Sequence, residues 1–278
     1  MNRRKFLTRL SLTLGGAALL ASYPLWIERR IVLVNTYRIP VPRLPRAFHG
    51  FRLVHLTDLH YGFLVSLKFL QSVVKRANRI PRDVTICTGD IVDVRNSSHQ
   101  IDRVWPLLSH LRAPGGGFSV LGNHDHWADG DRSRFWLRRT GQDLSRKAVC
   151  FTRDGQRLWM AGTGDLMEDH VPLDSVIQSI PKDDCRIVLA HNPDTADTDY
   201  RSPVDLMISG HTHGGQVRIP FFGSPILPVR NKTYSCGVKQ TPKKYPIFIS
   251  RGIGWSILPI RFNCYPEIAV LELASGPA

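Results

Sequence analysis

Five short clusters of polar residues follow one another along this chain, and their side chains are of the types that bind divalent metal ions. The clusters read Asp58-x-His60, Gly89-Asp90-x-x-Asp93, Gly122-Asn123-His124-Asp125, His191-Asn192 and Gly210-His211-Thr212-His213. Most of them begin where an apolar, strand-like run ends, and functional groups collect at the carboxyl ends of strands in α/β folds. Mixed carboxylate, amide and imidazole ligands suit Mn²⁺, Fe or Zn²⁺ better than Mg²⁺ or Ca²⁺. The pattern therefore predicts a site for two transition-metal ions.

Each cluster alone is a weak signal. An Asp-x-His pair is more often a surface feature, and a lone histidine such as His191 is more often structural. The pair His211-x-His213 also occurs in metallo-β-lactamase-like hydrolases, but those need a following Asp-His, where this chain has Gly214-Gly215-Gln216. The five clusters together, in this order, carry the prediction.

The order of the clusters resembles the calcineurin-like metallophosphoesterases, whose motifs read D-x-H, G-D-x-x-D, G-N-H-D/E, a lone H and G-H-x-H. The resemblance covers about residues 51–273. In the last third it narrows to the bacterial YaeI/YkuE-like phosphodiesterases, through residues 191–194, 210–216 and 261–267. It implies a four-layer αββα sandwich with two divalent metal ions at the top of two facing sheets. Mn²⁺ is the expected ion, with Fe or Zn²⁺ as alternatives.

The resemblance also implies a role for each residue. Asp58, His60 and His213 would hold the first metal ion, Asn123, His191 and His211 the second, and Asp90 would bridge the two. His124 would contact the phosphoryl group or protonate the leaving oxygen, and Asp125 would orient the His124 imidazole. Asp93 is expected to be a helper rather than a ligand. His55, His126 and His170 are expected to be structural or surface residues, and Arg251 and Arg261 to form buried ion pairs, for example with Glu267.

The function that follows from the resemblance is a two-metal-dependent phosphodiesterase or pyrophosphatase. A hydroxide that bridges the metal ions would attack phosphorus and break a P–O bond. A lipid-linked or nucleotide-sugar-lipid substrate such as UDP-diacylglucosamine is expected, because the close relatives include enzymes that resemble UDP-diacylglucosamine pyrophosphatases and because the chain is expected at a membrane. Two alternatives stay open, a nuclease of the same superfamily and a non-catalytic metal-bound scaffold. Nucleic acid is the less favoured partner, because no basic stripe rich in aromatic residues stands out.

The first 50 residues are expected to lie outside the catalytic domain. Residues 1–30 resemble a twin-arginine signal or membrane anchor, because Arg3-Arg4 precedes an uncharged stretch, residues 10–27, that is about 27 Å long as a helix. A poor cleavage site favours an uncleaved tether, exported by the twin-arginine translocase to the outer, periplasmic face of the inner membrane. A tether that faces the cytoplasm is the alternative, since Arg29 and Arg30 follow the stretch. Residues 31–50 read as a linker.

Residues 51–278 are predicted to form one metallophosphoesterase domain of the α/β class. Alternating strands and helices, followed by a strand-rich second half, are typical of a layered sandwich. Helices are expected at residues 66–79, capped by Ser66, at 101–111, and at 131–140, opened by an Asp cap. Strands are expected at residues 51–57, 83–88, 117–121, 148–152, 157–161, 185–190, 204–209, 247–250 and 268–273.

Net charge and cysteine content restrict the possible functions less than the motifs do. The formal net charge is +14, of which residues 1–50 contribute +8 (nine basic residues against Glu28) and the remainder +6. A mildly basic body suits an anionic substrate or a membrane surface, but it equally suits a solvated surface. The five cysteines include no Cys-x-x-Cys pair, so we expect no disulfide framework.

Overall fold

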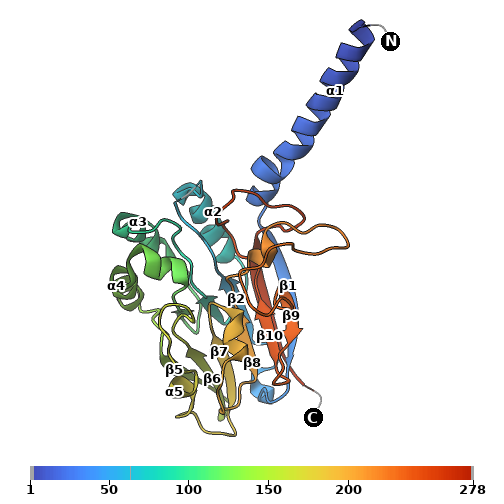
Figure 1. The fold of residues 1–278 in the computed structure, drawn as a ribbon. Coiled ribbons are helices and arrows are strands. Elements are labelled where there is room, and N and C mark those ends of the chain that lie inside the picture. Colours follow the sequence, from blue (N-terminus) through green and yellow to red (C-terminus); the bar gives the residue numbers. More distant parts are fainter. Residues whose placement is uncertain (1–2, 63, 277–278) are drawn as a thin grey trace.

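Two mixed β-sheets face each other at the centre of the computed structural model, which describes residues 3–62 and 64–276 (Figure 1). The five-stranded sheet has the order β1-β11-β2-β3-β4 and the six-stranded sheet the order β5-β6-β7-β8-β10-β9. The strands are β1 (Leu33–Val41), β2 (Arg52–Leu56), β3 (Val84–Cys87), β4 (Gly117–Ser119), β5 (Lys147–Arg153), β6 (Gln156–Gly162), β7 (Cys185–Leu189), β8 (Leu206–Ser209), β9 (Gly237–Gln240), β10 (Pro246–Ile249) and β11 (Glu267–Ser275). All nine predicted strands are present.

Three helices pack on the outer face of the five-stranded sheet. The helices of the chain are α1 (Arg3–Ser22), α2 (Leu67–Ala77), α3 (Ser98–Leu108), α4 (Asn123–Thr140) and α5 (Asp174–Ile177). The cap predicted for α2 is confirmed, because the Ser66 side chain accepts a hydrogen bond from the Phe69 amide. The helix predicted at residues 131–140, with its Asp cap, is present as the second part of α4: the helix is interrupted at Asp129, whose side chain accepts from the Arg132 amide. The turns of α4 from Asn123 to this interruption were not predicted.

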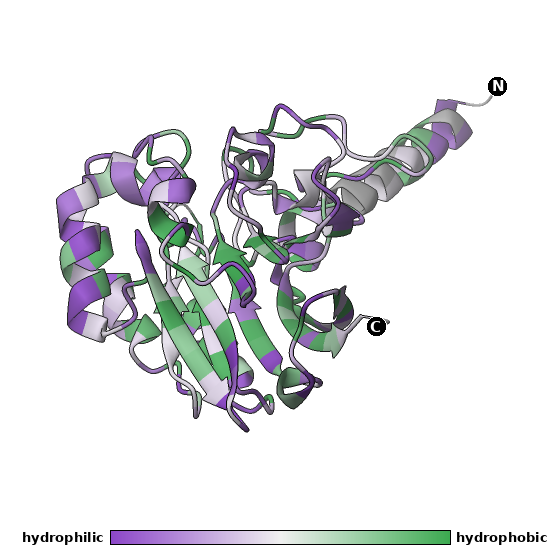
Figure 2. Cartoon of the chain, turned by 90° about the horizontal axis from the view of Figure 1, so that it is seen from below, coloured by the Kyte–Doolittle hydropathy of each residue, from purple (hydrophilic) through white to green (hydrophobic). Residues whose placement is uncertain are grey.

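The hydrophobic core lies between the two sheets, where strands from both contribute fully buried side chains. Figure 2 shows these strands as mainly hydrophobic ribbons beneath more hydrophilic helices. A second cluster lies under α2, α3 and α4. The outer face of the six-stranded sheet is covered by α5, the 3-10 turn η4 (Pro193–Asp197) and loops. The predicted fourth layer is therefore thin.

The linker predicted for residues 31–50 is wrong. Residues 33–41 form β1, which pairs in parallel with β11 along its whole length and buries Ile39 and Val41 completely. Pro40 obscured the strand in the sequence, but β1 lies at the edge of its sheet, where a residue without an amide hydrogen is tolerated.

The segment that follows α1 also belongs to the folded body. The π turn η1 (Tyr23–Ile27) and the 3-10 turn η2 (Glu28–Arg30) connect α1 to β1. Glu28 and Arg29 are buried, and the Glu28 carboxylate accepts from the Cys264 amide at 2.6 Å. The expectation that residues 1–30 lie wholly outside the fold is therefore wrong for residues 23–30. Helix α1 extends away from the body (Figure 1), and no helix in the described part of the chain is both long and apolar enough to cross a membrane.

Candidate metal centre

The predicted metal ligands converge at one edge of the two sheets, although they come from distant parts of the chain. Asp58 and His60 follow β2, Asp90 follows β3, His191 follows β7, and His211 and His213 follow β8. Among the residues that the structure describes, three groups could hold a metal ion, and the ligand atoms of each group lie within 4.8 Å of one another: Asp58, His60 and His213; His60, Asp90 and His124; Asp90, His191 and His211.

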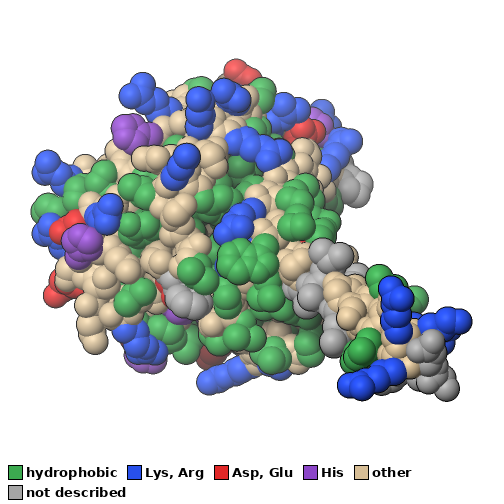
Figure 3. Space-filling view, turned by 90° about the horizontal axis from the view of Figure 1, so that it is seen from above, with side chains coloured by type: hydrophobic (Ala, Val, Ile, Leu, Met, Phe, Trp, Pro, Cys, Tyr) green, Lys and Arg blue, Asp and Glu red, His purple; other side chains and the backbone are tan. Residues whose placement is uncertain are grey.

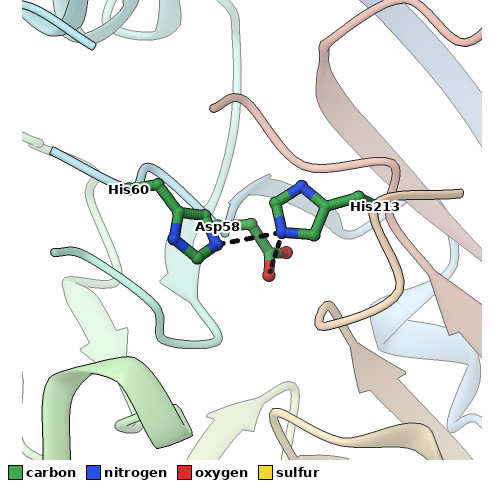
Figure 4. A group of neighbouring side chains, drawn as sticks. All are labelled: Asp58, His60 and His213. Atoms are coloured by element: carbon green, nitrogen blue, oxygen red, sulfur yellow. Dashed lines mark hydrogen bonds and ion pairs between the residues drawn. The ribbon is translucent and has the colours of Figure 1, made fainter. Parts of the chain in front are cut away.

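The first predicted ligand set is Asp58, His60 and His213, whose side chains point toward one another in Figure 4. The Nε2 atoms of His60 and His213 are 2.9 Å apart, and Nε2 of His213 is 3.6 Å from Oδ1 of Asp58. Two ligand atoms at about 2.1 Å from one ion in a tetrahedral or octahedral shell are separated by roughly 3.0–3.4 Å. The spacing of this set fits a shared cation.

The second set is joined to the first by one carboxylate oxygen. Nε2 of His191 lies 3.1 Å from Nδ1 of His211 and 3.2 Å from Oδ2 of Asp90. The same Asp90 oxygen lies 3.5 Å from Nε2 of His60. The predicted ligand Asn123 is buried, and its Oδ1 has no hydrogen-bond partner within the described residues. An unsatisfied buried amide oxygen is costly unless something absent from the chain, such as a cation, binds it.

Hydrogen bonds to the far nitrogen of three imidazoles leave the near nitrogen available for a metal ion. Nδ1 of His60 is 3.1 Å from Oδ1 of Asp93, Nδ1 of His191 is 2.6 Å from the Thr88 carbonyl oxygen, and Nε2 of His211 is 2.9 Å from the Pro228 carbonyl oxygen. Such contacts fix the tautomer and the ring orientation. Asp93 is thus a helper, as predicted. The two carbonyl partners were missed, because a backbone carbonyl has no signature in the sequence.

The backbone at the ligands is strained in a way that aims their side chains. Asp58, His60, Asp90, His211 and His213 all have positive φ, between 46° and 68°. This conformation costs about 1–3 kcal/mol per residue and gathers at functional sites. Gly122 supplies a close approach beside Asn123, because a Cβ there would lie 2.3 Å from Oδ1 of Asp90.

The four ligand imidazoles divide into two pairs by pKa. Burial alone would lower the pKa values of His60 and His191, but neighbouring carboxylates outweigh it: Asp93 and Asp90 raise that of His60, and Asp90 raises that of His191 to about 10. Burial acts to raise the pKa of Asp90, but the neighbouring His191, with His124 and His60, outweighs it and holds this pKa well below its usual range. Burial lowers the pKa of His211 to about 3, and burial with the charge of His60 lowers the pKa of His213. Metal ligation needs neutral imidazole and ionised carboxylate, so His60 and His191 would release their protons on binding a cation.

His124 lies beside both ligand sets without belonging to the predicted ligands. Its amide donates to Oδ1 of Asp90 at 2.9 Å, and its Nδ1 lies 3.1 Å from the Asp93 carbonyl oxygen. The role expected for Asp125 is wrong. The Asp125 carboxylate accepts from the amides of Gly122, Asp90 and Ile91 instead of contacting the His124 ring. Asp125 occupies the third position of α4, from which a side chain reaches back to the helix start.

Asp165 is a buried residue near the site that the sequence analysis missed. Its Oδ2 has no hydrogen-bond partner in the described chain, and burial raises its pKa. It follows β6 in the run Gly162-Thr-Gly-Asp165, so the strand-Gly-Asp pattern that indicated Asp90 could have indicated it too.

The arginine and histidine predictions outside the ligand sets have mixed outcomes. Arg261 is fully buried but donates to the carbonyls of Gly254, Arg251 and Cys264, so its expected pairing with Glu267 is wrong. His55 is structural, as predicted: it is buried against Thr88, and burial lowers its pKa to about 3.

Comparison with known proteins agrees with this geometry. The family model for calcineurin-like phosphoesterases matches residues 51–215. The chain is 34% identical to the uncharacterized metallophosphoesterase YkuE of Bacillus subtilis, over 99% of this chain and 98% of that protein. It is 32% identical to phosphodiesterase YaeI of Escherichia coli, over 80% and 82%. It is 26% identical to UDP-2,3-diacylglucosamine pyrophosphatase LpxG of Chlamydia muridarum, over 84% and 88%. With its ligand motifs gathered at one edge of two facing sheets, the chain belongs to the calcineurin-like phosphoesterases and is a metal-dependent hydrolase of phosphoric esters.

Proposed function

We propose that the protein is a phosphodiesterase or pyrophosphatase that uses two divalent ions, with Mn²⁺ as the first candidate and Fe or Zn²⁺ as alternatives. The observation that carries the proposal is the position of Asp90. One of its oxygens lies within 3.5 Å of ligand nitrogens from both sets, as a bridging carboxylate would. Nitrogen ligands from four histidines favour these metals over Mg²⁺ and Ca²⁺.

The residues that would hold the ions divide between the two sets. Asp58, His60 and His213 would hold the first ion, and Asn123, His191 and His211 the second. When bound, such a pair of ions makes a nucleophile available from water at neutral pH and offsets negative charge on the phosphoryl oxygens. The donor atoms and their spacing support this assignment.

His124 is the side chain best placed to protonate the leaving oxygen. The Asp93 carbonyl fixes its Nδ1, so Nε2 is the atom free to contact substrate. Burial lowers the pKa of His124, and the ring is therefore neutral at pH 7 in the free enzyme. An anionic phosphodiester beside the ring would favour its protonated form, which could then donate a proton as the P–O bond breaks.

A lipid-linked or nucleotide-sugar-lipid substrate is the class that we propose, with UDP-diacylglucosamine as the type compound. One relative is named a UDP-2,3-diacylglucosamine pyrophosphatase and another a phosphodiesterase, which supports this class without selecting a compound. The second candidate function is a nuclease, favoured only by the basic net charge of the body. A metal-bound scaffold without activity would not need His124 poised beside Asp90.

We propose that the protein is located on the outer face of the inner membrane and reaches it by twin-arginine export. The paired Arg3-Arg4 and the uncharged residues 10–27 support it. A tether that faces the cytoplasm is the alternative, and in both cases α1 would hold the body at the membrane.

A substrate screen tests the function. The full chain, reloaded with Mn²⁺, would be assayed on bis(p-nitrophenyl) phosphate, UDP-diacylglucosamine and single-stranded DNA. We expect hydrolysis of the aryl diester and of the nucleotide lipid. Cleavage of DNA with no hydrolysis of the nucleotide lipid would favour the nuclease. Full metal content with no hydrolysis of any of the three would favour the scaffold.

A further inference from the structure

Six large apolar side chains lie at the surface of two loops next to the metal centre. They are Ile219, Phe221, Phe222, Ile226, Ile257 and Leu258, here named the apolar rim. Phe221 is fully exposed, and Phe222 and Ile257 are each 87% exposed. Single exposed apolar residues are ordinary, but a group of this size on adjacent loops marks an interaction surface.

The backbone at the tips of both loops is strained, and the side chains there make no intramolecular packing that would offset the strain. Phe221 and Ile257 have φ of 69° and 63°, values that are rare for an aromatic residue and more so for a β-branched one. Packing normally compensates such strain, yet both side chains extend into solvent. The compensating contact is therefore expected outside this chain.

The two loops of the rim are joined to each other and to the base of α1. Val217 and Phe262 form a β-bridge between the loops. The Arg261 amide donates to the Pro24 carbonyl in the turn after α1. Trp26, in that same turn, is 58% exposed. Figure 3 shows hydrophobic side chains gathered on this face beside the projecting helix, with Lys and Arg around them.

The same loops are attached directly to the metal ligands. Pro228, in the loop of Phe221, accepts the hydrogen bond from His211. Gln216 exchanges two hydrogen bonds with Ser256, which connects the loop of Ile257 to the residues that follow His213. A partner seated on the rim would therefore lie close to the metal centre.

The charge around the rim identifies the chemistry of the partner. The loop of Phe221, residues 216–236, contains Arg218, Arg230 and Lys232 and no Asp or Glu. Arg230 and Lys232 are exposed on the loop of Phe221, and Arg30 is exposed beside Trp26. The partner must then be apolar in its interior and negative at its surface. A bilayer with anionic headgroups has both properties and accepts aromatic and aliphatic side chains alike, whereas stacking on nucleic-acid bases would use Phe221 and Phe222 but not the four aliphatic residues of the rim.

We propose that the apolar rim docks into the headgroup and acyl boundary of an anionic lipid bilayer, with Phe221, Phe222 and Ile257 inserted and the surrounding Arg and Lys side chains on the headgroups. Docking would hold the metal centre at the level of the headgroup phosphates. The docking proposal does not depend on the proposed function. Only the inference that docking favours lipid-linked substrates rests on that function. The docking proposal also does not require α1 to cross the membrane.

Site-specific photo-crosslinking in the full chain tests the proposal. Phe221→p-benzoylphenylalanine and Ile257→p-benzoylphenylalanine would be irradiated with vesicles of phosphatidylethanolamine and phosphatidylglycerol at about 3:1. The matched control is Phe135→p-benzoylphenylalanine, because Phe135 is an exposed aromatic residue on α4. We expect lipid adducts at positions 221 and 257 that exceed those at 135 several-fold. Equal lipid adducts at all three positions, or adducts to a second copy of the chain instead of lipid, would overturn the proposal.

A vesicle partition measurement adds a magnitude. Phe221→Ser combined with Phe222→Ser and Ile257→Ser should weaken partition into the same vesicles at least 10-fold more than Phe135→Ser, because full burial of one such side chain contributes about a factor of ten. Unchanged metal content would show that the variant is folded. Activity on the soluble aryl diester is read separately, so a failure of the proposed function and a failure of the docking surface give different results. If the p-benzoylphenylalanine variants form no lipid adducts but still cleave the aryl diester, the docking proposal is wrong and the proposed function is unaffected.

Discussion

Asp90 and Asp125 are two buried carboxylates in neighbouring motifs, and their surroundings give them different properties. Imidazoles surround Asp90 and, against the effect of burial, keep its pKa below the usual range. Burial, together with the charge of Asp90, raises the pKa of Asp125 to about 6, although backbone amides hydrogen-bond it. The first carboxylate is suited to hold cations and the second to hold the loop that carries Asp90.

Substitution of Asp90 should separate metal binding from proton transfer. We expect Asp90→Asn to lower bound metal and activity together, because a neutral amide cannot bridge two cations as a carboxylate does. His124→Ala should retain its metal and slow turnover by roughly 10²–10⁴-fold, the range for a lost general acid. A substrate with a leaving group of low pKa should recover part of that loss. Metal analysis that finds Asp90→Asn fully occupied would contradict the bridging role.

For single residues, the sequence predicts well which side chains form the site, but poorly which backbone groups orient them. The motifs placed Asp58, His60 and His213 beside one another, as the structure does. Thr88 and Pro228 orient two imidazoles through carbonyl oxygens that every residue possesses, so their types carried no signal. The error over Asp125 has a related cause: the direction of this side chain depends on the helical turns that begin at Asn123, and the sequence analysis predicted only the part of α4 after its interruption at Asp129.

At the scale of elements, an ion pair connects α4 to the loop that carries Asp165. Nε2 of His126 lies 3.2 Å from Oδ2 of Asp169, and both side chains are buried. Burial alone would lower the pKa of His126, but the bond to Asp169 outweighs it and the pKa is raised. Stabilisation by protonated His126 is therefore complete below the unfolded pKa of about 6.5 and is lost as pH rises through the folded pKa.

The pH dependence of stability should show this pair. His126→Gln should lower the melting temperature more at pH 5.5 than at an alkaline pH above the folded-state pKa of His126, where the wild-type imidazole has lost its charge. The difference should be a few degrees, at about 2–4 °C per kcal/mol for a chain of this size. Asp169 also binds Arg134 and Arg146, so it keeps partners in the variant. An equal loss at both pH values would show that the pair does not titrate.

Strand β1 should be essential to the body, although its sequence resembles a linker. A chain that begins at residue 45 would lose burial of Ile39 and Val41, about 1.5–3 kcal/mol each, and two hydrogen bonds to the buried Glu267 carboxylate from Asn35 and Tyr37. We expect it to unfold at lower urea concentration than a chain that begins at residue 23, or to aggregate through the exposed edge of β11. Equal urea midpoints for the two chains would contradict this role.

At the scale of the whole molecule, the sequence predicted the body more completely than its junction with the N-terminal helix. Most of the body follows from local patterns, because most strands of the two sheets have their own apolar run; β1, which Pro40 obscured, and the short, mostly polar β9 are the exceptions. The junction depends on contacts between residues more than 230 positions apart, such as Tyr23 with Tyr265 and Glu28 with Cys264. No local pattern reports such contacts, and the charged pair Arg29-Arg30 reads as solvent-exposed even though Arg29 packs over Trp255.

The proposed location of the protein rests on α1 and on the paired arginines, Arg3 and Arg4, with which this helix begins. The twin-arginine route exports folded proteins, so in the proposed pathway the body would bind its metal ions before it leaves the cytoplasm. We expect Arg3→Lys with Arg4→Lys to retain the body in the cytoplasm, while the matched control Arg9→Lys leaves its location unchanged. Protease treatment of spheroplasts reads the outcome: the wild-type body should be digested from outside, and the double variant should be protected. A wild-type body that resists protease until the membrane is lysed, and whose location ignores both substitutions, would place the tether on the cytoplasmic side and move the substrate to the inner leaflet.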